Sequence, residues 1–586
     1  MKFLLAAVNA KYIHSNPAVY SLKAYAGAEY EKEIEIAEYT INHTMGDILS
    51  GIYQKRPDVI GFSCYIWNWR LVCELTAELH KVMPALPIWL GGPEVSFDAG
   101  TVLEENRGVT GIMTGEGEET FRELVVYYKE KDRGREPEKG LGEIAGIVFR
   151  QDGYTVRTKK REPLKMDLLP FLYEDAGCFQ NRIIYYESSR GCPFQCSYCL
   201  SSIDKKVRFR EMETVKKELQ FFLDSKVEQV KFVDRTFNCS HMHTVGIWKY
   251  LIDHDNGVTN FHFEIAGDRL EDGELEILSQ MRPGLVQLEM GVQSANPLTL
   301  QAVQRNMDIE RLKKTVEHIR KGGNVHIHLD LIAGLPYENY ESFGKSFNVV
   351  YEMKPEQLQL GFLKVLKGSP MHRKAGEYGI KYMSLPPYEV LCSNWLSFGE
   401  ICKLKRIEEM VELYYNSNQF THTLPALEKL FPSPFAMFEK LAEYYEENGY
   451  FVNSPSRAYR YGILLDFALC YGGKQEGLYK ELLTYDIYLR ENMKSRPGFA
   501  RDLSGYKEKF RNFYNKEEQI REILPGYEEY ELKQIARMTH VEVFSYPVWE
   551  PGGDMNRLEE DAVALFDYKK RNPLTKEAGA VILDRW

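Results

Sequence analysis

The 586-residue sequence lacks the marks of several classes of protein. No stretch approaches the roughly eighteen uncharged apolar residues that a membrane span needs. Acidic residues number 85 against 74 basic ones, so the net charge of −11 provides no general attraction to phosphate backbones or anionic lipid. Ten cysteines are too few for a disulfide scaffold of this length. The sequence therefore predicts a cytoplasmic protein without a membrane partner and disfavours nucleic acid as a partner.

The pattern of apolar segments divides this α/β chain into four parts. Residues 1–140 alternate short, nearly continuous apolar runs with amphipathic stretches, which is typical of a doubly wound parallel sheet (Rossmann-like). We interpret residues 141–183 as a linker with a hairpin. Residues 184–375 contain six further strand–helix units, which predict a partial (β/α)6 barrel. Residues 376–586 are rich in Tyr, Glu and Leu and predict a mainly helical domain of unknown role, with one strand-like segment at Val541–Trp549.

The individual strands follow from the same runs. In the first part we expect strands at Lys2–Val8, Ile34–Tyr39, Val59–Ser63, Pro87–Leu90 and Gly111–Met113. In the barrel we expect strands at Ile183–Glu187, Gln229–Asp234, Asn260–Ala266, Leu285–Gly291, His326–Ile332 and Leu358–Leu366.

A cluster of three cysteines follows the first strand of the barrel. Cys192, Cys196 and Cys199 have the spacing CxxxCxxC, and three thiolates within eight residues converge only if the chain wraps around a common centre. Zinc is the competing ligand, but a structural zinc site prefers a fourth Cys or His, and no short second pair follows. The spacing therefore favours a [4Fe–4S] cluster with one iron that has no protein ligand.

These cysteines, with Tyr198 before the last of them, resemble the motif of the radical S-adenosylmethionine (SAM) superfamily. The resemblance implies that the cysteines hold a [4Fe–4S] cluster, that SAM binds the fourth iron, and that one electron cleaves SAM to a 5′-deoxyadenosyl radical. It also implies SAM-binding positions at the ends of the barrel strands. Segments similar to those of the family place six candidates there: Asp234, Glu264, Glu289, Gln293, Ser294 and Gly334.

The first part lacks the motifs of the common nucleotide-binding domains. No GxGxxG follows its first strand and no GxxxxGK[ST] occurs, which removes the main support for a dinucleotide or P-loop site. Gly91 and Gly92 follow the fourth strand and leave room for a ligand against the backbone. With Ser63, they resemble the cobalamin-binding domain that precedes many radical SAM barrels. Because the cobalamin signature DxHxxG is absent, His14 is the tentative cobalt ligand, and a plain loop histidine or an empty Rossmann-like domain are the alternatives.

The tyrosine-rich C-terminal part allows two interpretations. Tyrosines interleaved with Arg457 and Arg460 are one way to hold single-stranded RNA. Amphipathic helices that bury their tyrosine rings explain the same pattern, and the abundant acidic residues favour this second interpretation. We expect a helical cap that shields the barrel mouth from water.

The sequence thus predicts a cobalamin-dependent radical SAM enzyme, with a [4Fe–4S] cluster, SAM and cobalamin as cofactors, that methylates an unactivated carbon. The expected partners are a small-molecule or peptide substrate and a reducing electron donor, flavodoxin or ferredoxin. Two alternatives remain open: a radical SAM enzyme that catalyses cyclisation, oxidation or rearrangement, and a sensing protein that uses the cluster and the corrinoid.

Overall fold

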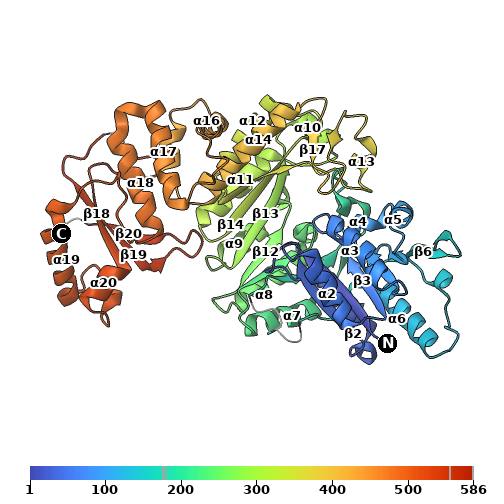
Figure 1. The fold of residues 1–586 in the computed structure, drawn as a ribbon. Helices are drawn as coiled ribbons and strands as arrows, with labels where there is room; N and C mark the ends of the chain where they lie inside the picture. Colours follow the sequence, from blue (N-terminus) through green and yellow to red (C-terminus); the bar gives the residue numbers. More distant parts are fainter. Residues whose placement is uncertain (174–176, 178–180, 554–555, 584–586) are drawn as a thin grey trace.

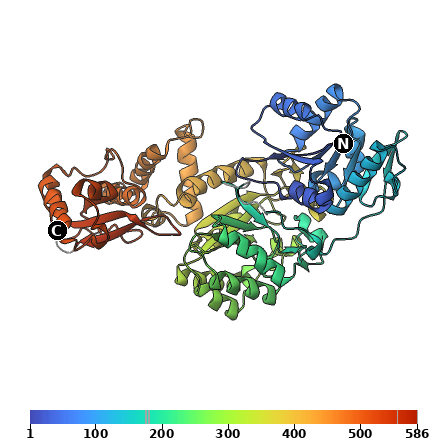
Figure 2. The ribbon, with the colours of Figure 1, turned by 90° about the horizontal axis from the view of Figure 1, so that it is seen from below.

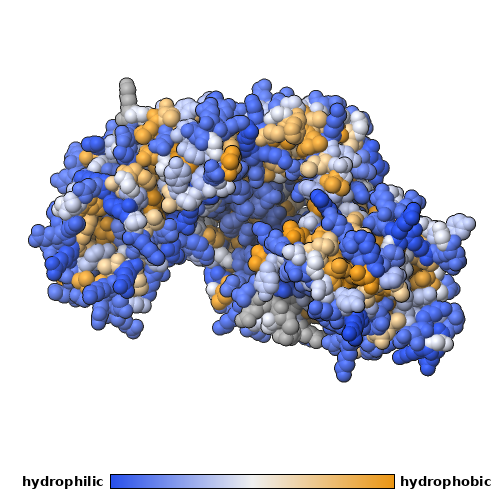
Figure 3. Space-filling view, in the orientation of Figure 1, coloured by the Kyte–Doolittle hydropathy of each residue, from blue (hydrophilic) through white to orange (hydrophobic). Residues whose placement is uncertain are grey.

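The computed structural model describes residues 1–586 except 174–176, 178–180, 554–555 and 584–586. Three bodies follow one another along the chain, and the C-terminal body extends from the barrel on the side away from the N-terminal sheet (Figures 1 and 2). No helix among the described residues is long and apolar enough to cross a membrane. On the face shown in Figure 3, side chains are mostly hydrophilic and the apolar ones form small groups.

The N-terminal sheet is doubly wound, as predicted. Its first five strands are parallel in the order β2-β1-β3-β4-β5, and they are β1 (Phe3–Asn9), β2 (Ile34–Thr40), β3 (Val59–Ser63), β4 (Ile88–Gly91) and β5 (Gly111–Met113). One face packs on a core shared with α2 (Met45–Lys55), α3 (Trp69–Val82), α4 (Pro93–Ser96) and α5 (Ala99–Glu105), and the other on a core with α1 (Pro17–Ala26) and α6 (Glu118–Asp132). Helices on both faces explain why β1 and β3 are apolar at nearly every position.

The hairpin expected in the linker belongs instead to this sheet. β6 (Ile147–Gln151) and β7 (Tyr154–Arg157) add two antiparallel strands beyond β5. Ile147, Val148 and Phe149 are each only 1% exposed. Their burial extends the core of the first domain, so the sheet continues past residue 140 and only the segment after β7 connects it to the barrel.

The second sheet is an open six-stranded parallel barrel with strands in sequential order. It consists of β8 (Ile184–Tyr186), β11 (Gln229–Phe232), β12 (Asn260–Glu264), β13 (Val286–Gln293), β14 (His326–Ala333) and β15 (Gln357–Phe362). β8 and β15 are its two edges, which confirms the partial barrel. The helices on its outer side are α7 (Met212–Asp224), α8 (His241–Asp253), α9 (Asp272–Ser279), α10 (Pro297–Ala302), α11 (Ile309–Gly322) and α12 (Tyr340–Tyr351), and α13 (Pro370–Lys374) follows β15.

Two short strands frame the cysteine segment. β9 (Ser189–Arg190) directly precedes it and β10 (Arg208–Phe209) follows it, and the two pair antiparallel. Between them Gly191 has φ +107, and a Cβ there would lie 2.6 Å from the backbone oxygen of Lys206. Only glycine fits this close approach of the two ends of the loop.

The C-terminal part is helical, as expected, but it also contains a three-stranded antiparallel sheet. Its helices are α14 (Phe398–Met410), the π-helix η8 (Val411–Asn416), α15 (Thr423–Glu428), α16 (Pro434–Glu447), α17 (Arg457–Gly472), α18 (Glu476–Arg490), α19 (Lys507–Ile520) and α20 (Leu532–Met538). The small pair β16 (Lys381–Tyr382) and β17 (Val390–Cys392) precedes them, and the terminal sheet is β18 (Thr539–Phe544), β19 (Ala562–Arg571) and β20 (Ala578–Leu583). Tyr414, Tyr445 and Tyr479 are buried in the core, which agrees with the packing interpretation of the tyrosines.

Candidate functional site

The three cysteines of the motif lie together at the mouth of the barrel. All three line one cavity of about 240 Å³, and Cys192 and Cys196 are only 8% and 7% exposed. The Cys192 Sγ atom lies 3.5 Å from the hydroxyl oxygen of Thr236. An arginine that the sequence did not single out, Arg305, donates to the Sγ atom of Cys196 at 3.6 Å. No other Cys or His among the described residues lines this cavity, and three thiols are a donor set that fits a [4Fe–4S] cluster.

Asp234 supports the cysteine loop from behind and does not line this cavity. Its carboxylate is fully buried and accepts hydrogen bonds from the Ser188 backbone N–H at 2.9 Å, from the Ser188 hydroxyl at 2.7 Å and from the Ser189 hydroxyl at 2.5 Å. Burial raises the pKa of Asp234 to about 6, against the lowering effect of these hydrogen bonds. The residue therefore fixes the strand end from which the loop departs.

Two carboxylates and an amide from two neighbouring barrel strands also line the cavity. Glu264 ends β12, Glu289 lies in β13 and Gln293 ends β13. Gln293 has φ +74 at a bulge in the pairing with β14, a backbone strain of the kind that clusters at functional sites. Its side-chain oxygen is buried and has no hydrogen-bond partner among the described residues, so it is free to accept a bond from a ligand.

The charges of these two carboxylates are strongly perturbed. Burial raises the pKa of Glu264 to about 7, and the neighbouring Glu289 adds to the effect. Glu289 behaves in the opposite way: burial opposes its ionisation, but His262 at 2.9 Å and Lys231 at 3.2 Å lower its pKa to about 2. One carboxylate therefore stays ionised near neutral pH, while its neighbour titrates there.

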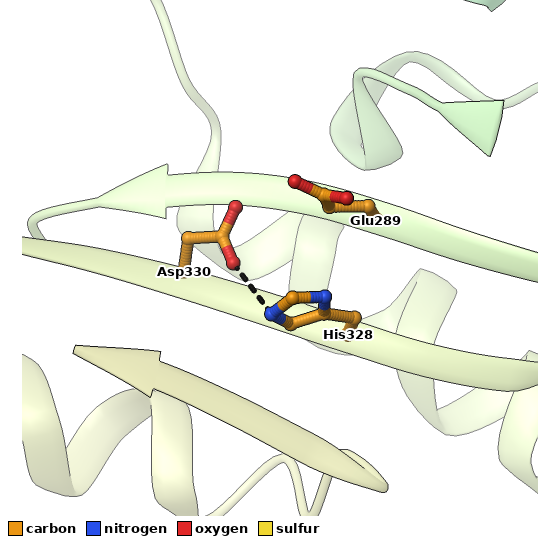
Figure 4. Close-up of side chains that lie close together, drawn as sticks. All are labelled: Glu289, His328 and Asp330. Carbon is orange, nitrogen blue, oxygen red and sulfur yellow. Dashed lines mark ion pairs between the residues drawn. The ribbon is translucent and has the colours of Figure 1, made fainter. Parts of the chain in front are cut away.

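Asp330 also lines the cavity. The sequence analysis did not name it, but named Gly334, four residues later. Figure 4 shows that Glu289 of β13 and His328 and Asp330 of β14 point toward one another. Their ligand atoms lie within 4.8 Å of one another, close enough to hold a metal ion. The Lys231 ammonium group already provides a positive charge beside Glu289, so the protein itself balances part of this negative charge.

Two of the predicted SAM positions lie away from the cavity. The Ser294 hydroxyl donates to the buried Glu338 at 2.6 Å and so ties the end of β13 to the loop after β14. Gly334 has φ +91, and a Cβ there would lie 2.7 Å from the side chain of Val390 in β17. Neither residue lines the cavity, because both are occupied with packing the loops that follow the strands.

A second, larger cavity of about 770 Å³ separates the edge of the N-terminal sheet from the barrel. His14 lines it, and the His14 Nδ1 atom lies 2.6 Å from the hydroxyl of Tyr185, which leaves Nε2 available to a ligand. Tyr65 and Trp67 also line it, with rings stacked at 4.3 Å. An aromatic wall beside a histidine suits a large planar ligand.

Ser63, Gly91 and Gly92 do not line this larger cavity. Ser63 is buried, and its oxygen accepts a hydrogen bond at 2.8 Å from Asn16, which does line the cavity. Gly92 has φ +111, and a Cβ there would lie 2.5 Å from the backbone oxygen of Cys64. The glycine is thus required by the close approach of two loops of the protein, and Ser63 acts on the cavity through Asn16.

Arginines connect the two cavities and the two domains. Arg235 lines both cavities. Arg190, two residues before Cys192, forms ion pairs with Glu118 of α6 at 3.0 Å and with Glu187 at 2.7 Å. The cysteine loop is therefore held directly against the edge of the N-terminal sheet.

The residues that sequence reasoning missed are Arg235, Arg305 and Asp330. Asp330 lies within β14, four residues before the predicted position Gly334, so a signal for it existed. Arg305 lies more than a hundred residues from Cys196, and nothing in its local sequence marks it. Its role follows only from the folded barrel.

Comparison with known families divides the chain in the same way. A model described as the B12 binding domain matches residues 4–125, and one described as the radical SAM superfamily matches residues 186–350. Two parts of the chain therefore match a cobalamin-binding domain and a radical SAM domain. Residues 376–566 match a family described as protein of unknown function (DUF4080).

Several characterised proteins are similar to it. The cobalamin-dependent radical SAM methyltransferase TokK of Streptomyces tokunonensis is 25% identical over 353 residues, which cover 56% of this chain and 50% of TokK. The anaerobic magnesium-protoporphyrin IX monomethyl ester cyclase of Rubrivivax gelatinosus is 26% identical over 318 residues, 51% of this chain and 55% of the cyclase. The chain thus spans about half the length of these curated relatives.

Solved structures support the fold. The cobalamin-dependent SAM radical enzyme OxsB, solved with aqua-cobalamin bound, superposes with a TM-score of 0.57 at 15% identity, over 91% of this chain and 81% of OxsB. At this level of identity, the likeness concerns the arrangement of the domains.

Proposed function

We propose that this protein is a cobalamin-dependent radical SAM methyltransferase that acts on an unactivated carbon of a small-molecule or peptide substrate. The observation that carries the proposal is the cavity where Cys192, Cys196 and Cys199 meet. Through Arg235 this cavity adjoins the larger one against the cobalamin-binding domain. The similarity to the methyltransferase TokK over 353 residues supports the choice of reaction.

Within this proposal the three cysteines hold the [4Fe–4S] cluster, and Glu264, Glu289 and Gln293 face the SAM molecule. A cluster with bound SAM supplies a 5′-deoxyadenosyl radical on one-electron reduction, and cobalamin supplies a carrier for the methyl group. The ionised Glu289 favours a ligand that carries a positive charge, as SAM does at its sulfonium and ammonium groups. Asp234, Ser294 and Gly334 act indirectly, by fixing the loops around the cavity.

His14 is our proposed ligand for the lower face of cobalamin. The His14 Nδ1 atom is engaged by the Tyr185 hydroxyl, an arrangement typical of metal-ligating histidines whose second nitrogen is held by a hydrogen bond. Burial, with Lys11 and Lys231, lowers the pKa of His14 and so keeps the imidazole neutral. Ser63, Gly91 and Gly92 do not line the larger cavity, and they act on it by fixing the loops around it.

The decisive experiment is anaerobic reconstitution of the full-length protein with iron, sulfide and hydroxocobalamin. We expect about four irons per chain, bound corrinoid, and reductive cleavage of SAM, as the cluster assignment implies. Replacement of Cys192, Cys196 and Cys199 by Ser is expected to abolish iron binding and SAM cleavage. Cys239→Ser is the matched control, because Cys239 lies close to the loop but does not line the cavity. A triple variant that retains full iron would contradict the proposal.

A second candidate is a radical SAM enzyme that uses cobalamin without methylation, and similarity to the anaerobic cyclase favours it. The products distinguish the two. Methylation yields S-adenosylhomocysteine together with 5′-deoxyadenosine, whereas cyclisation, oxidation or rearrangement yields 5′-deoxyadenosine alone. Binding of SAM without any cleavage under strong reductant would instead indicate a sensing protein.

The proposal also implies partners. Reduction of the cluster requires an electron donor, for which we propose flavodoxin or ferredoxin in the cytoplasm. Nucleic acid is not part of the proposal. Of the tyrosines considered for stacking, Tyr445 and Tyr461 are buried and Tyr459 is exposed, and the net charge of −11 does not favour RNA.

A further inference from the structure

The interior of the barrel is polar at nearly every inward position. Strand register places side chains from β11 to β15 in three layers that share one face of the sheet. The lower layer contains Lys231, His262, Gln287 and His326, the middle layer Glu264, Glu289, His328 and Gln357, and the upper layer Asp330 and Gln359. Barrel interiors are normally filled with branched apolar residues, so this composition requires a reason.

The alternate positions of the same strands are apolar. Phe261, Leu288 and Leu329 are fully buried in the core between the sheet and the outer helices. The polar residues are therefore not a sign of an unstable or exposed sheet. They are confined to the inward face, beneath the cavity that contains the three cysteines.

Two histidines each lie behind a carboxylate of that cavity. The His262 Nε2 atom is 2.9 Å from the Glu289 Oε2 atom, and the His328 Nε2 atom is 2.9 Å from the Asp330 Oδ1 atom. Glu289 and Asp330 line the cavity, whereas neither histidine does. His262 and His328 are 6% and 5% exposed, so the histidines contact the carboxylates from within the protein.

We propose that His328 and His262 are positioning residues that hold Asp330 and Glu289 in place for the cationic SAM molecule. The inference rests on the proposed function and concerns the layer beneath its binding site. A carboxylate held by a buried partner keeps its orientation when the ligand is absent, so less conformational entropy is lost on binding.

The electrostatics of the pair His328–Asp330 agree with this role. Burial opposes the charge on both groups, yet the carboxylate raises the pKa of His328 above its ordinary value. Burial raises the pKa of Asp330, and His328 counteracts this rise. The other titratable or charged groups that face the pair are Lys231 from β11, His262 and Glu264 from β12, Glu289 from β13 and His326 from β14.

The test is the affinity of the anaerobically reconstituted protein for SAM, measured by equilibrium dialysis between pH 6 and pH 9. We expect His328→Leu to weaken SAM binding by about tenfold to a hundredfold, as for loss of the partner of a buried carboxylate. The loss should grow toward lower pH, because Asp330 without His328 is protonated at a higher pH. His328→Gln, which retains an N–H donor, should recover part of the affinity. His326→Leu, one layer lower on the same strand, is the matched control.

The outcomes separate the two proposals. If wild-type protein binds SAM and both His328 variants bind it with wild-type affinity and pH profile, the positioning role is wrong while the proposed function stands. If His328→Leu does not fold, the Gln variant and His262→Gln, which acts on Glu289, carry the same test. Failure of the wild-type protein itself to bind SAM would overturn the proposed function and this inference together.

Discussion

At the residue scale, the cysteine loop depends on one glycine as much as on its thiols. A side chain at Gly191 would meet the backbone oxygen of Lys206 at 2.6 Å, and φ +107 adds strain of about 1–2 kcal/mol for any other residue. We expect Gly191→Ala to displace the loop and lower the iron content after anaerobic reconstitution well below that of wild type. Gly257→Ala is the matched control, since Gly257 also has positive φ but nothing lies within 4 Å of its Cβ position. Equal iron content in the two variants would show that the close contact does not matter.

The same scale shows what a sequence can reveal about a site. The three cysteines were predictable because their spacing is local and their chemistry restricts the interpretation. The resemblance to the radical SAM superfamily implied six SAM positions, of which Glu264, Glu289 and Gln293 line the cavity. Arg305 was not predictable, because its contact with Cys196 exists only after six strands have formed.

At the element scale, the π-helix η8 covers the open edge of the barrel. The Asn416 side chain accepts from the Leu358 backbone N–H and donates to the Leu358 backbone oxygen, both at 2.9 Å, in place of a neighbouring strand. Asn416→Leu removes both bonds and is expected to destabilise the fold by about 1–3 kcal/mol, measured as a lower midpoint of urea unfolding. Asn448→Leu, at the exposed end of α16, is the control and should change the midpoint little. Equal midpoints for both variants would exclude a role for Asn416 in closing the edge.

Strands with continuous apolar runs were predicted correctly. Strands that can be recognised only from the strand with which they pair were not. The parallel strands β1 and β3 of the N-terminal sheet are buried on both faces, so their sequences identify them without knowledge of the fold. The hairpin β6–β7 was assigned to a linker, because antiparallel addition to the edge of a parallel sheet leaves no local pattern. β19 was not predicted: it changes from buried apolar residues to exposed basic ones near Arg571, so no continuous apolar run marks the whole strand.

At the scale of the whole molecule, the barrel and the C-terminal part share one apolar core. Buried residues from β8 through α18 belong to a single cluster. The boundary near residue 375 is therefore a change in the sequence pattern and not a break in the apolar core. Periodicity alone could not reveal this continuity, because it records the pattern along the chain and not which elements pack together. It also means that loss of stability around the barrel mouth should affect the unfolding of both parts.

The buried carboxyl group of Glu338, in the loop after β14, should make the stability of this shared core depend on pH. It is fully buried, it accepts hydrogen bonds from Ser294 and Ser346 at 2.6 and 2.7 Å, and burial raises its pKa to about 7 against their lowering effect. Because the folded protein holds this proton more tightly than the unfolded chain, its contribution to stability is complete below about pH 4.5 and is lost as pH rises through 7. A shift of this size corresponds to about 3 kcal/mol. We expect Glu338→Gln to flatten the decline in the urea midpoint between pH 5 and pH 8, with Glu341→Gln, exposed on α12, as the control. A wild-type decline that persists unchanged in Glu338→Gln would assign it to other groups.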